Sequence, residues 1–325
     1  MLICYVRYRI TLKLLLHFNS DVNLSRSVLN YAAHQNLRTL TIVFKKDEKI
    51  MPKNYCTEIQ EKGYVKIPQL VDKATLTTLK NSVDHRWQIL QKNPLKAEDA
   101  PYLNQGHLII YNLQNKDIFC FQIFLKNPVL RAILIDCLND QWYKQIPQSQ
   151  PNFILRSLSA RSSGNTGMPL HIDSFIPNPG SHMWVLQVAI VLEEQNRENG
   201  CTLVLPGSHR LGTYASQDWL QYATPIESNP GDVVIWDSRL WHGAMPNTTT
   251  KTRWSIIATF SRWWIKQNYN ITGNLPKHIL QNLSDEEMSV LGFCSIPPQD
   301  EHERQDIKTG YEVLKEFKQT IKDLI

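Results

Sequence analysis

The pattern of hydrophobic and polar residues changes character close to Pro151. Before that point, apolar residues recur at helical spacing after a helix-start signal at Asp72, and a second helix is predicted over residues 126–142. A short apolar strand pattern at the start of the stretch GYVKIPQLVDK, from Gly63, predicts a strand ahead of the first helix. This part of the chain is therefore predicted to be a scaffold of helices with an accompanying strand.

Beyond Pro151 the pattern is that of short strands. β-Branched and aromatic runs alternate with Gly, Asn and Pro turn signals, and these runs cover residues 153–160, 183–194, 201–206, 231–237 and 253–264. Several strands at such spacing predict an antiparallel sandwich or barrel. After residue 267 the chain turns polar, with a helix predicted at 284–291 and a last amphipathic stretch at 310–325.

These changes divide the chain into four predicted segments: an N-terminal extension (1–50), a strand and helical scaffold (51–150), a β-rich core (151–266) and a polar helical C-terminal extension (267–325). The first segment is basic and has no acidic residue before Asp21. It fits either a transit segment or sequence translated upstream of a start at Met51.

Composition places the protein among ordinary globular proteins, since 42% of its 325 residues are apolar and 20% are charged. The net charge of +5 comes from residues spread along the chain, so no nucleic-acid partner is expected. The six cysteines form no CxxC pair, which favours reduced thiols and a cytoplasmic location. No apolar run of about 18 residues is present, so no membrane span is expected.

The most informative motif is His171-Ile172-Asp173. In an extended segment, residues two apart point to the same face, so the imidazole and the carboxylate converge. His242 follows the strand predicted at 231–237 and offers a third ligand. Two histidines and one carboxylate on one side of an octahedral ion leave three adjacent positions open, as in non-haem Fe(II) oxygenases. By itself an HxD tripeptide arises readily by chance, and a histidine is more often structural.

Two further residues extend this hypothesis. Arg253 follows His242 by eleven residues and opens a predicted strand. Its planar fork matches a carboxylate, so it could clamp the far end of a dicarboxylate bound to the metal; a salt bridge at the surface or an interface is the alternative. Gln187 alternates with apolar residues in the strand at 183–194, so it is a candidate to reach the pocket, and an ordinary strand position is the alternative.

Longer motifs support the same chemistry. They are HID at 171–173, NGCTLVLPGSHR at 199–210, PGDVVIWDSRLWHGAMPN at 230–247, and Arg253 at its spacing after His242. Together they resemble the phytanoyl-CoA dioxygenase family of Fe(II)- and 2-oxoglutarate-dependent oxygenases. With the weaker opening GYVKIPQLVDKATLTTL, the resemblance spans roughly residues 60 to 265.

The resemblance implies a mainly β fold with flanking helices around a double-stranded β-helix, a cupin-like jelly roll, over residues 151–266. It implies Fe(II) bound by His171, Asp173 and His242, 2-oxoglutarate held by Arg253, O2 as the second cosubstrate, and ascorbate as a candidate reductant. Two positions depart from the family pattern. Ile172 stands where many members have Gln, and Ala244 where many have a hydroxyl residue.

The reaction implied is oxidation of a small molecule, lipid-like or from secondary metabolism, with release of succinate and CO2. Hydroxylation is the usual outcome, while desaturation and ring closure stay open; the carboxylate of Asp173 argues against halogenation. Two alternatives remain: a jelly-roll protein that binds a ligand or metal without turnover, and an oxygenase that hydroxylates a protein side chain. Loops at 93–107, 174–183 and 211–229 are expected to select the substrate.

Overall fold

The computed structural model describes residues 55–92, 108–143 and 146–297, together with residues 312, 314, 315, 318 and 319. The predicted N-terminal extension, the loop at 93–107 and most of the stretch at 310–325 lie outside these residues. The described part of the chain belongs to one unit, Asn54–Ile325.

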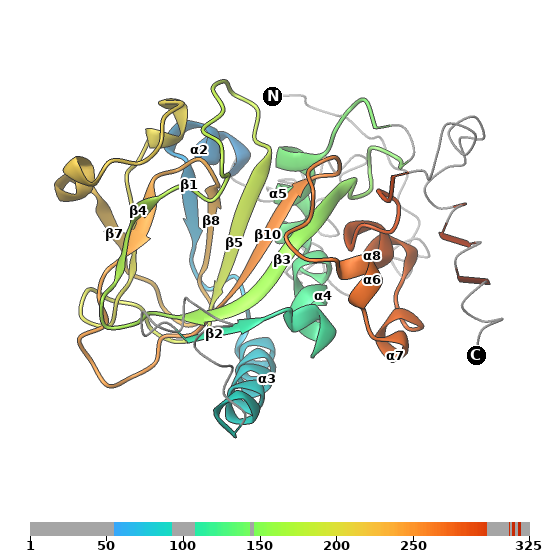
Figure 1. The fold of residues 1–325 in the computed structure, drawn as a ribbon, viewed down its shortest axis with the longest axis horizontal. Helices are drawn as coiled ribbons and strands as arrows, with labels where there is room; N and C mark the ends of the chain where they lie inside the picture. Colours follow the sequence, from blue (N-terminus) through green and yellow to red (C-terminus); the bar gives the residue numbers. More distant parts are fainter. Residues whose placement is uncertain are drawn as a thin grey trace, which may run out of the picture. The chain divides into compact units, whose positions relative to one another are not determined.

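The larger of two antiparallel sheets has six strands in the order β1-β8-β5-β10-β3-β2 (Figure 1). Its strands are β1 (Tyr64–Ile67), β2 (Leu108–Tyr111), β3 (Phe153–Ser162), β5 (Val185–Val191), β8 (Val233–Asp237) and β10 (Ser255–Arg262). Strands β3, β5, β8 and β10 fall on four runs that the sequence predicts. The fifth run, at 201–206, enters the second sheet.

The smaller sheet has four strands in the order β4-β9-β6-β7. They are β4 (Met168–His171), β6 (Thr202–Val204), β7 (Thr224–Ile226) and β9 (His242–Ala244). Side chains of both sheets meet in a small apolar cluster that includes Ala189 and Val234 of the larger sheet and Val204 and Ile226 of the smaller one. The two sheets therefore face one another across an apolar interior, as the predicted jelly roll requires.

The other face of the larger sheet packs on helices, and alternation along β10 shows the division. Ile256, Ala258 and Phe260 belong to the main core cluster, whereas Ile257 packs against the cluster between the sheets. Because side chains alternate along a strand, one face of β10 meets the helices and the other lines the barrel. The helices are α2 (Tyr55–Lys62), α3 (Lys73–Lys92), α4 (Phe119–Lys126) and α5 (Pro128–Leu138).

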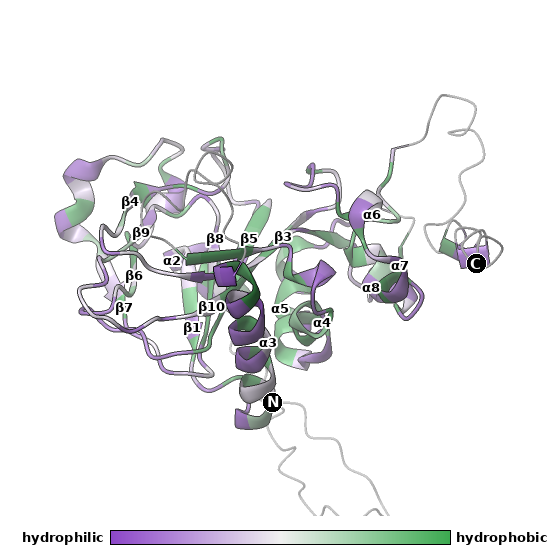
Figure 2. Ribbon diagram, turned by 60° about the horizontal axis from the view of Figure 1, so that its bottom comes forward, coloured by the Kyte–Doolittle hydropathy of each residue, from purple (hydrophilic) through white to green (hydrophobic). Residues whose placement is uncertain are grey.

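Helices α4 and α5 differ from the one helix predicted at 126–142. Asn127 separates them, because its side chain accepts hydrogen bonds from the backbone N–H groups of Val129 (3.1 Å) and Leu130 (3.2 Å) and so caps α5. Pro128 follows as the first helical residue, where its missing N–H and fixed φ are favourable. Both helices are largely hydrophobic (Figure 2). Their apolar composition buries them against the larger sheet.

Three short helices follow the barrel: α6 (Ile271–Asn274), α7 (Lys277–Leu280) and α8 (Asp285–Val290). The last lies within the predicted 284–291, and Ser284 and Glu287 form a reciprocal capping box at its start. None of the helices described is long and apolar enough to cross a membrane.

Candidate metal centre

Two neighbouring strands of the smaller sheet bring His171 and His242 together. His171 ends β4 and His242 begins β9, and the two residues stand directly opposite each other in the pairing of these strands. Their ring centroids are 4.2 Å apart. Asp173 lies just beyond β4 rather than within it, which differs from the extended segment that the sequence predicts.

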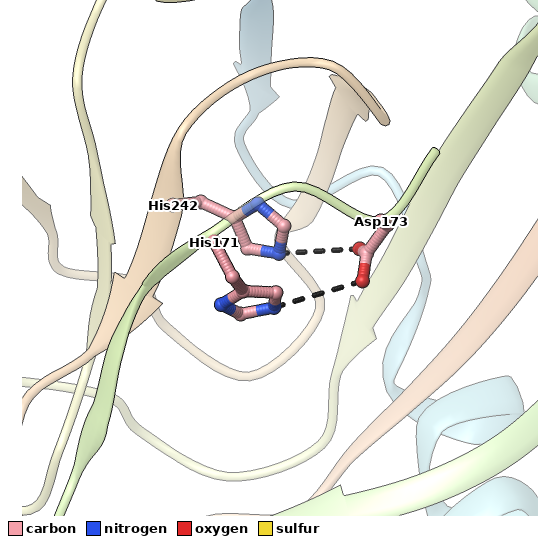
Figure 3. Close-up of side chains that lie close together, drawn as sticks. All are labelled: His171, Asp173 and His242. Carbon is pink, nitrogen blue, oxygen red and sulfur yellow. Dashed lines mark ion pairs between the residues drawn. The ribbon is translucent and has the colours of Figure 1, made fainter. Parts of the chain in front are cut away.

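The carboxylate of Asp173 faces both imidazoles (Figure 3). Its Oδ2 is 3.2 Å from Nε2 of His242 and its Oδ1 is 3.6 Å from Nε2 of His171. The backbone N–H of Asp173 donates to the carbonyl of Ser238 (2.8 Å), at the turn that follows β8. A non-local bond to this turn, rather than strand geometry, therefore orients the carboxylate.

The backbone also fixes the orientation of both imidazole rings. Nδ1 of His171 is 3.0 Å from the carbonyl oxygen of Pro169, and Nδ1 of His242 is 2.9 Å from that of Leu240. A carbonyl only accepts, so each Nδ1 carries the hydrogen and each ring directs Nε2 toward Asp173. The three side chains therefore present two nitrogen atoms and one carboxylate to the same small space.

The pKa shifts reflect this electrostatic arrangement. Burial opposes ionisation of Asp173, yet the two imidazoles hold the pKa of its carboxyl well below the ordinary value. Burial opposes protonation of His171, yet the same carboxylate raises its pKa. The carboxylate of Asp173 is therefore ionised and is the anionic group of the site.

The donor set fits a divalent transition metal. Ligand bonds of about 2.1 Å place adjacent ligand atoms roughly 3 Å apart, close to the separations found here. One ligand atom from each of the three residues lies within 4.8 Å of the others. Two neutral imidazoles and one carboxylate suit Fe(II), and the carbonyl bonds at Nδ1 are those that orient metal-binding histidines in many sites.

Arg253 lies just before the start of β10. The turn after β8 lies beside the other end of this strand. It is 9% exposed, and its Nη2 donates to the hydroxyl of Ser163. Its Nε is buried and has no hydrogen-bond acceptor among the described residues. Burial lowers the pKa of this guanidinium to about 10. A buried cation with an unused donor is suited to an anion such as a carboxylate.

Gln187 lies on the barrel face of β5, two residues before Ala189, and is buried. Thr259 on β10 donates to its side-chain oxygen (2.7 Å) and accepts from the hydroxyl of Ser157 on β3 (3.0 Å). These three side chains form a polar row across the sheet. The bond occupies the oxygen of Gln187, so a role toward a cosubstrate would rest on its amide nitrogen.

Sequence reasoning missed Arg239, which organises the loop after Asp173. Its guanidinium forms a buried, two-pronged ion pair with Asp237 (3.0 and 2.7 Å). It also donates to the carbonyls of Gly180 (2.7 Å) and Asn178 (3.3 Å). The signal was present in the sequence, as a charged pair inside the largely apolar run at 233–241.

A jelly roll in which two histidines and one aspartate converge defines a barrel protein with a candidate metal site. The model of the phytanoyl-CoA dioxygenase (PhyH) family matches residues 59–255, more than half of the 325 residues. The chain belongs to this family. The resemblance predicted from its motifs is thereby confirmed, and the protein is an enzyme of the dioxygenase class.

Individual relatives agree with this assignment. Dioxygenase af480 of Aspergillus fumigatus is 27% identical over 247 residues, which cover 73% of this chain and 76% of that protein. HygX from Streptomyces hygroscopicus, solved with nickel and 2-oxoglutarate bound, is 13% identical with a TM-score of 0.51, over 66% of this chain and 88% of HygX. The epimerase SnoN, in complex with Fe3+, alpha-ketoglutarate and nogalamycin RO, is 15% identical with a TM-score of 0.50, over 69% and 89%. At such identities the two structures confirm the jelly-roll fold alone.

Proposed function

We propose that the protein is an Fe(II)- and 2-oxoglutarate-dependent dioxygenase that hydroxylates a small molecule and releases succinate and CO2. The observation that carries the proposal is the convergence of His171, Asp173 and His242 from separate segments, with both imidazoles fixed so that Nε2 faces the carboxylate. HygX was solved with nickel and 2-oxoglutarate bound, and SnoN with Fe3+ and alpha-ketoglutarate, which supports the same kind of cofactors here.

When bound, iron and 2-oxoglutarate together supply the activation of dioxygen and the oxidation of a substrate C–H bond. The protein's own residues hold these groups. His171, Asp173 and His242 would hold the metal, and three protein ligands leave room for further ligands. Arg253 binds the distal carboxylate of 2-oxoglutarate through its free Nε–H, and the apolar cluster between the sheets excludes water from the interior.

An anaerobic titration tests the proposal. The full chain is titrated with Fe(II) and then 2-oxoglutarate while the visible metal-to-ligand charge-transfer band is followed. We expect a band in the wild type, none in His171→Ala, and one that needs more 2-oxoglutarate in Arg253→Met. His182→Ala is the matched control, because His182 is an exposed histidine of the neighbouring loop; its band should equal that of the wild type.

The outcomes separate the alternatives. No band in folded, iron-loaded wild-type protein would contradict the proposal and favour a jelly-roll protein that binds ligands without turnover. A band together with 2-oxoglutarate turnover that only peptide substrates stimulate would favour a protein side-chain hydroxylase instead.

A further inference from the structure

Exposed aromatic side chains lie in the two segments that flank the metal triad. Four of them, here called the aromatic rim, are Phe175, Tyr214, Trp219 and Tyr222. Each is at least 36% exposed, although aromatic rings are usually buried where a protein has room for them. Exposed apolar groups that cluster in this way mark binding surfaces.

One part of the rim is anchored to the strands that carry the two histidines. Trp219 packs edge-on against Trp241, with ring centroids 6.4 Å apart, and Trp241 precedes the second histidine. Gln217 bonds to both backbone groups of Leu170, accepting from its N–H (3.0 Å) and donating to its carbonyl (2.8 Å). Leu170 precedes the first histidine. The short helix over residues 217–222 is therefore held directly beside the metal triad.

The second part of the rim is the loop that follows Asp173. This loop meets the segment before Trp219, because a Cβ added to Gly212 would lie 3.5 Å from the Cβ of Pro179. The two parts of the rim thus belong to one surface. Phe175 lies in this loop, two residues beyond Asp173.

Phe175 is held in an unusual backbone conformation over a buried charge. Its φ of +63° is unfavourable for a bulky residue, yet its ring is 67% exposed. The guanidinium carbon of Arg156 lies 5.5 Å from the centre of this ring. Because Phe175 follows Asp173 by two residues, this contact places the guanidinium on the side of the barrel that carries the metal triad. Burial lowers the pKa of Arg156, and the charge of Asp173 opposes that shift.

Arg156 retains donors for a ligand. The residue is 6% exposed, and its Nε donates to the carbonyl of Lys266 (3.1 Å). Among the described residues, its two terminal nitrogens donate no hydrogen bond. A buried guanidinium that lies beneath an exposed ring can be reached by a small chemical group, but not by a flat macromolecular surface.

We propose that the aromatic rim binds a large, flat, apolar substrate, and that Arg156 donates hydrogen bonds to an oxygen acceptor on it. The proposal rests on the dioxygenase function proposed above and adds the substrate class. Phe175 and Trp219 cover the apolar body of the substrate, while Arg156 fixes its orientation relative to the metal triad. Arg156 is thereby a specificity-determining residue.

Two fluorescent probes test both parts of the proposal on the full chain. 1-Anilinonaphthalene-8-sulfonate is flat and apolar and carries an anionic acceptor; N-phenyl-1-naphthylamine has the same ring system without the sulfonate. We expect Trp219→Ala to weaken binding of both probes about tenfold, and Arg156→Met to weaken only the sulfonate, by about the same factor. Trp142→Ala is the control, because Trp142 is 88% exposed and lies outside the rim.

Several results would overturn the proposal. The first is unchanged probe binding in Trp219→Ala. The second is a loss of probe binding in Trp142→Ala equal to that in Trp219→Ala. The third is a loss in Arg156→Met that is the same for the probe with the sulfonate and the probe without it. Sedimentation velocity adds another: if the wild type is a dimer that Trp219→Ala dissociates, a second copy of the chain covers the rim. The charge-transfer titration of the wild type separates this inference from the proposed function, since its band reports on the metal and 2-oxoglutarate alone.

Discussion

At the scale of single residues, Arg253 carries a positive charge that is buried, and burial destabilises a charge. Burial lowers its pKa to about 10, well below the ordinary value of an arginine, so the fold destabilises the charged form. In the unfolded chain the group binds its proton more tightly, so by linkage stability rises as the pH increases above about 10. Below pH 10 the charge destabilises the protein, and a bound carboxylate would offset this effect.

Arg253→Met should therefore separate stability from binding. At neutral pH and without 2-oxoglutarate, we expect the variant to melt no lower than the wild type, because it removes a buried charge. Its affinity for 2-oxoglutarate should fall at least about tenfold with the loss of charge-assisted hydrogen bonds. Thermal melts with and without 2-oxoglutarate measure both effects. A variant that melts normally and still gains the full thermal shift from 2-oxoglutarate would contradict the role of Arg253.

At the scale of elements, the close approach of β4 and β9 sets the distance between the two histidines. Gly243 allows it, since an added Cβ would lie 2.5 Å from the carbonyl oxygen of Met168 on β4. That neighbour is backbone and can move only with its strand. Gly243→Ala should therefore displace His171 relative to His242 and weaken Fe(II) binding about 10- to 100-fold, as do other changes around metal ligands. Calorimetric Fe(II) titration of the folded variant measures this; unchanged affinity would show that the strand spacing is not limiting.

The Asp237–Arg239 pair links the end of β8 to the loop over the site. Both side chains are at most 5% exposed, so Arg239→Met leaves a buried carboxylate unpaired and should lower the free energy of unfolding by about 3–5 kcal/mol. In Arg239→Met/Asp237→Asn the unpaired charge is absent, and part of that loss should return. Urea unfolding of both variants measures the difference. Equal losses would mean that the bonds to Asn178 and Gly180 matter more than the charge.

The elements also show which features of the fold and the site can be predicted from the sequence. Alternation and turn residues predict the strands because both are local signals, and the HxD spacing predicts that His171 and Asp173 converge. Sequence does not predict that Asp173 leaves the strand, because a bond to Ser238, distant in sequence, orients it. The sequence does not indicate a role for Arg156 either, because its contact with Phe175 joins residues that are distant in sequence.

At the scale of the whole molecule, the barrel forms one layer, and the helices that pack on the larger sheet form another. The larger sheet uses one face for the site and the other for the main core, where it packs on α4 and α5. Strand β1 and helix α2 complete this arrangement at one edge. The N–H of Asp237 donates to the carbonyl of Gly63 (2.9 Å), and His209 contacts the carbonyl of Gln60 (3.0 Å). The segment from α2 onward therefore supports the strand and loops around the site.

This arrangement predicts where the chain can be shortened. The family match begins at residue 59, and the first buried apolar residue in the described part of the chain is Ile59. We expect a protein that starts at Met51 to melt within a few degrees of the full chain and to bind Fe(II) with the same affinity. If it does not, residues 1–50 belong to the working protein, and the interpretation of Met51 as a start is wrong.

A protein that starts at Gln69 is the matched control, because it also loses α2 and β1. It removes Ile59, Val65 and Ile67, each at most 5% exposed. At about 1.5–3 kcal/mol per buried side chain, their loss amounts to roughly 5–9 kcal/mol, comparable with the whole stability of a typical domain. We therefore expect this shorter protein to be unfolded, as seen by circular dichroism. If it folded and still bound Fe(II), the edge of the larger sheet would be dispensable for the site.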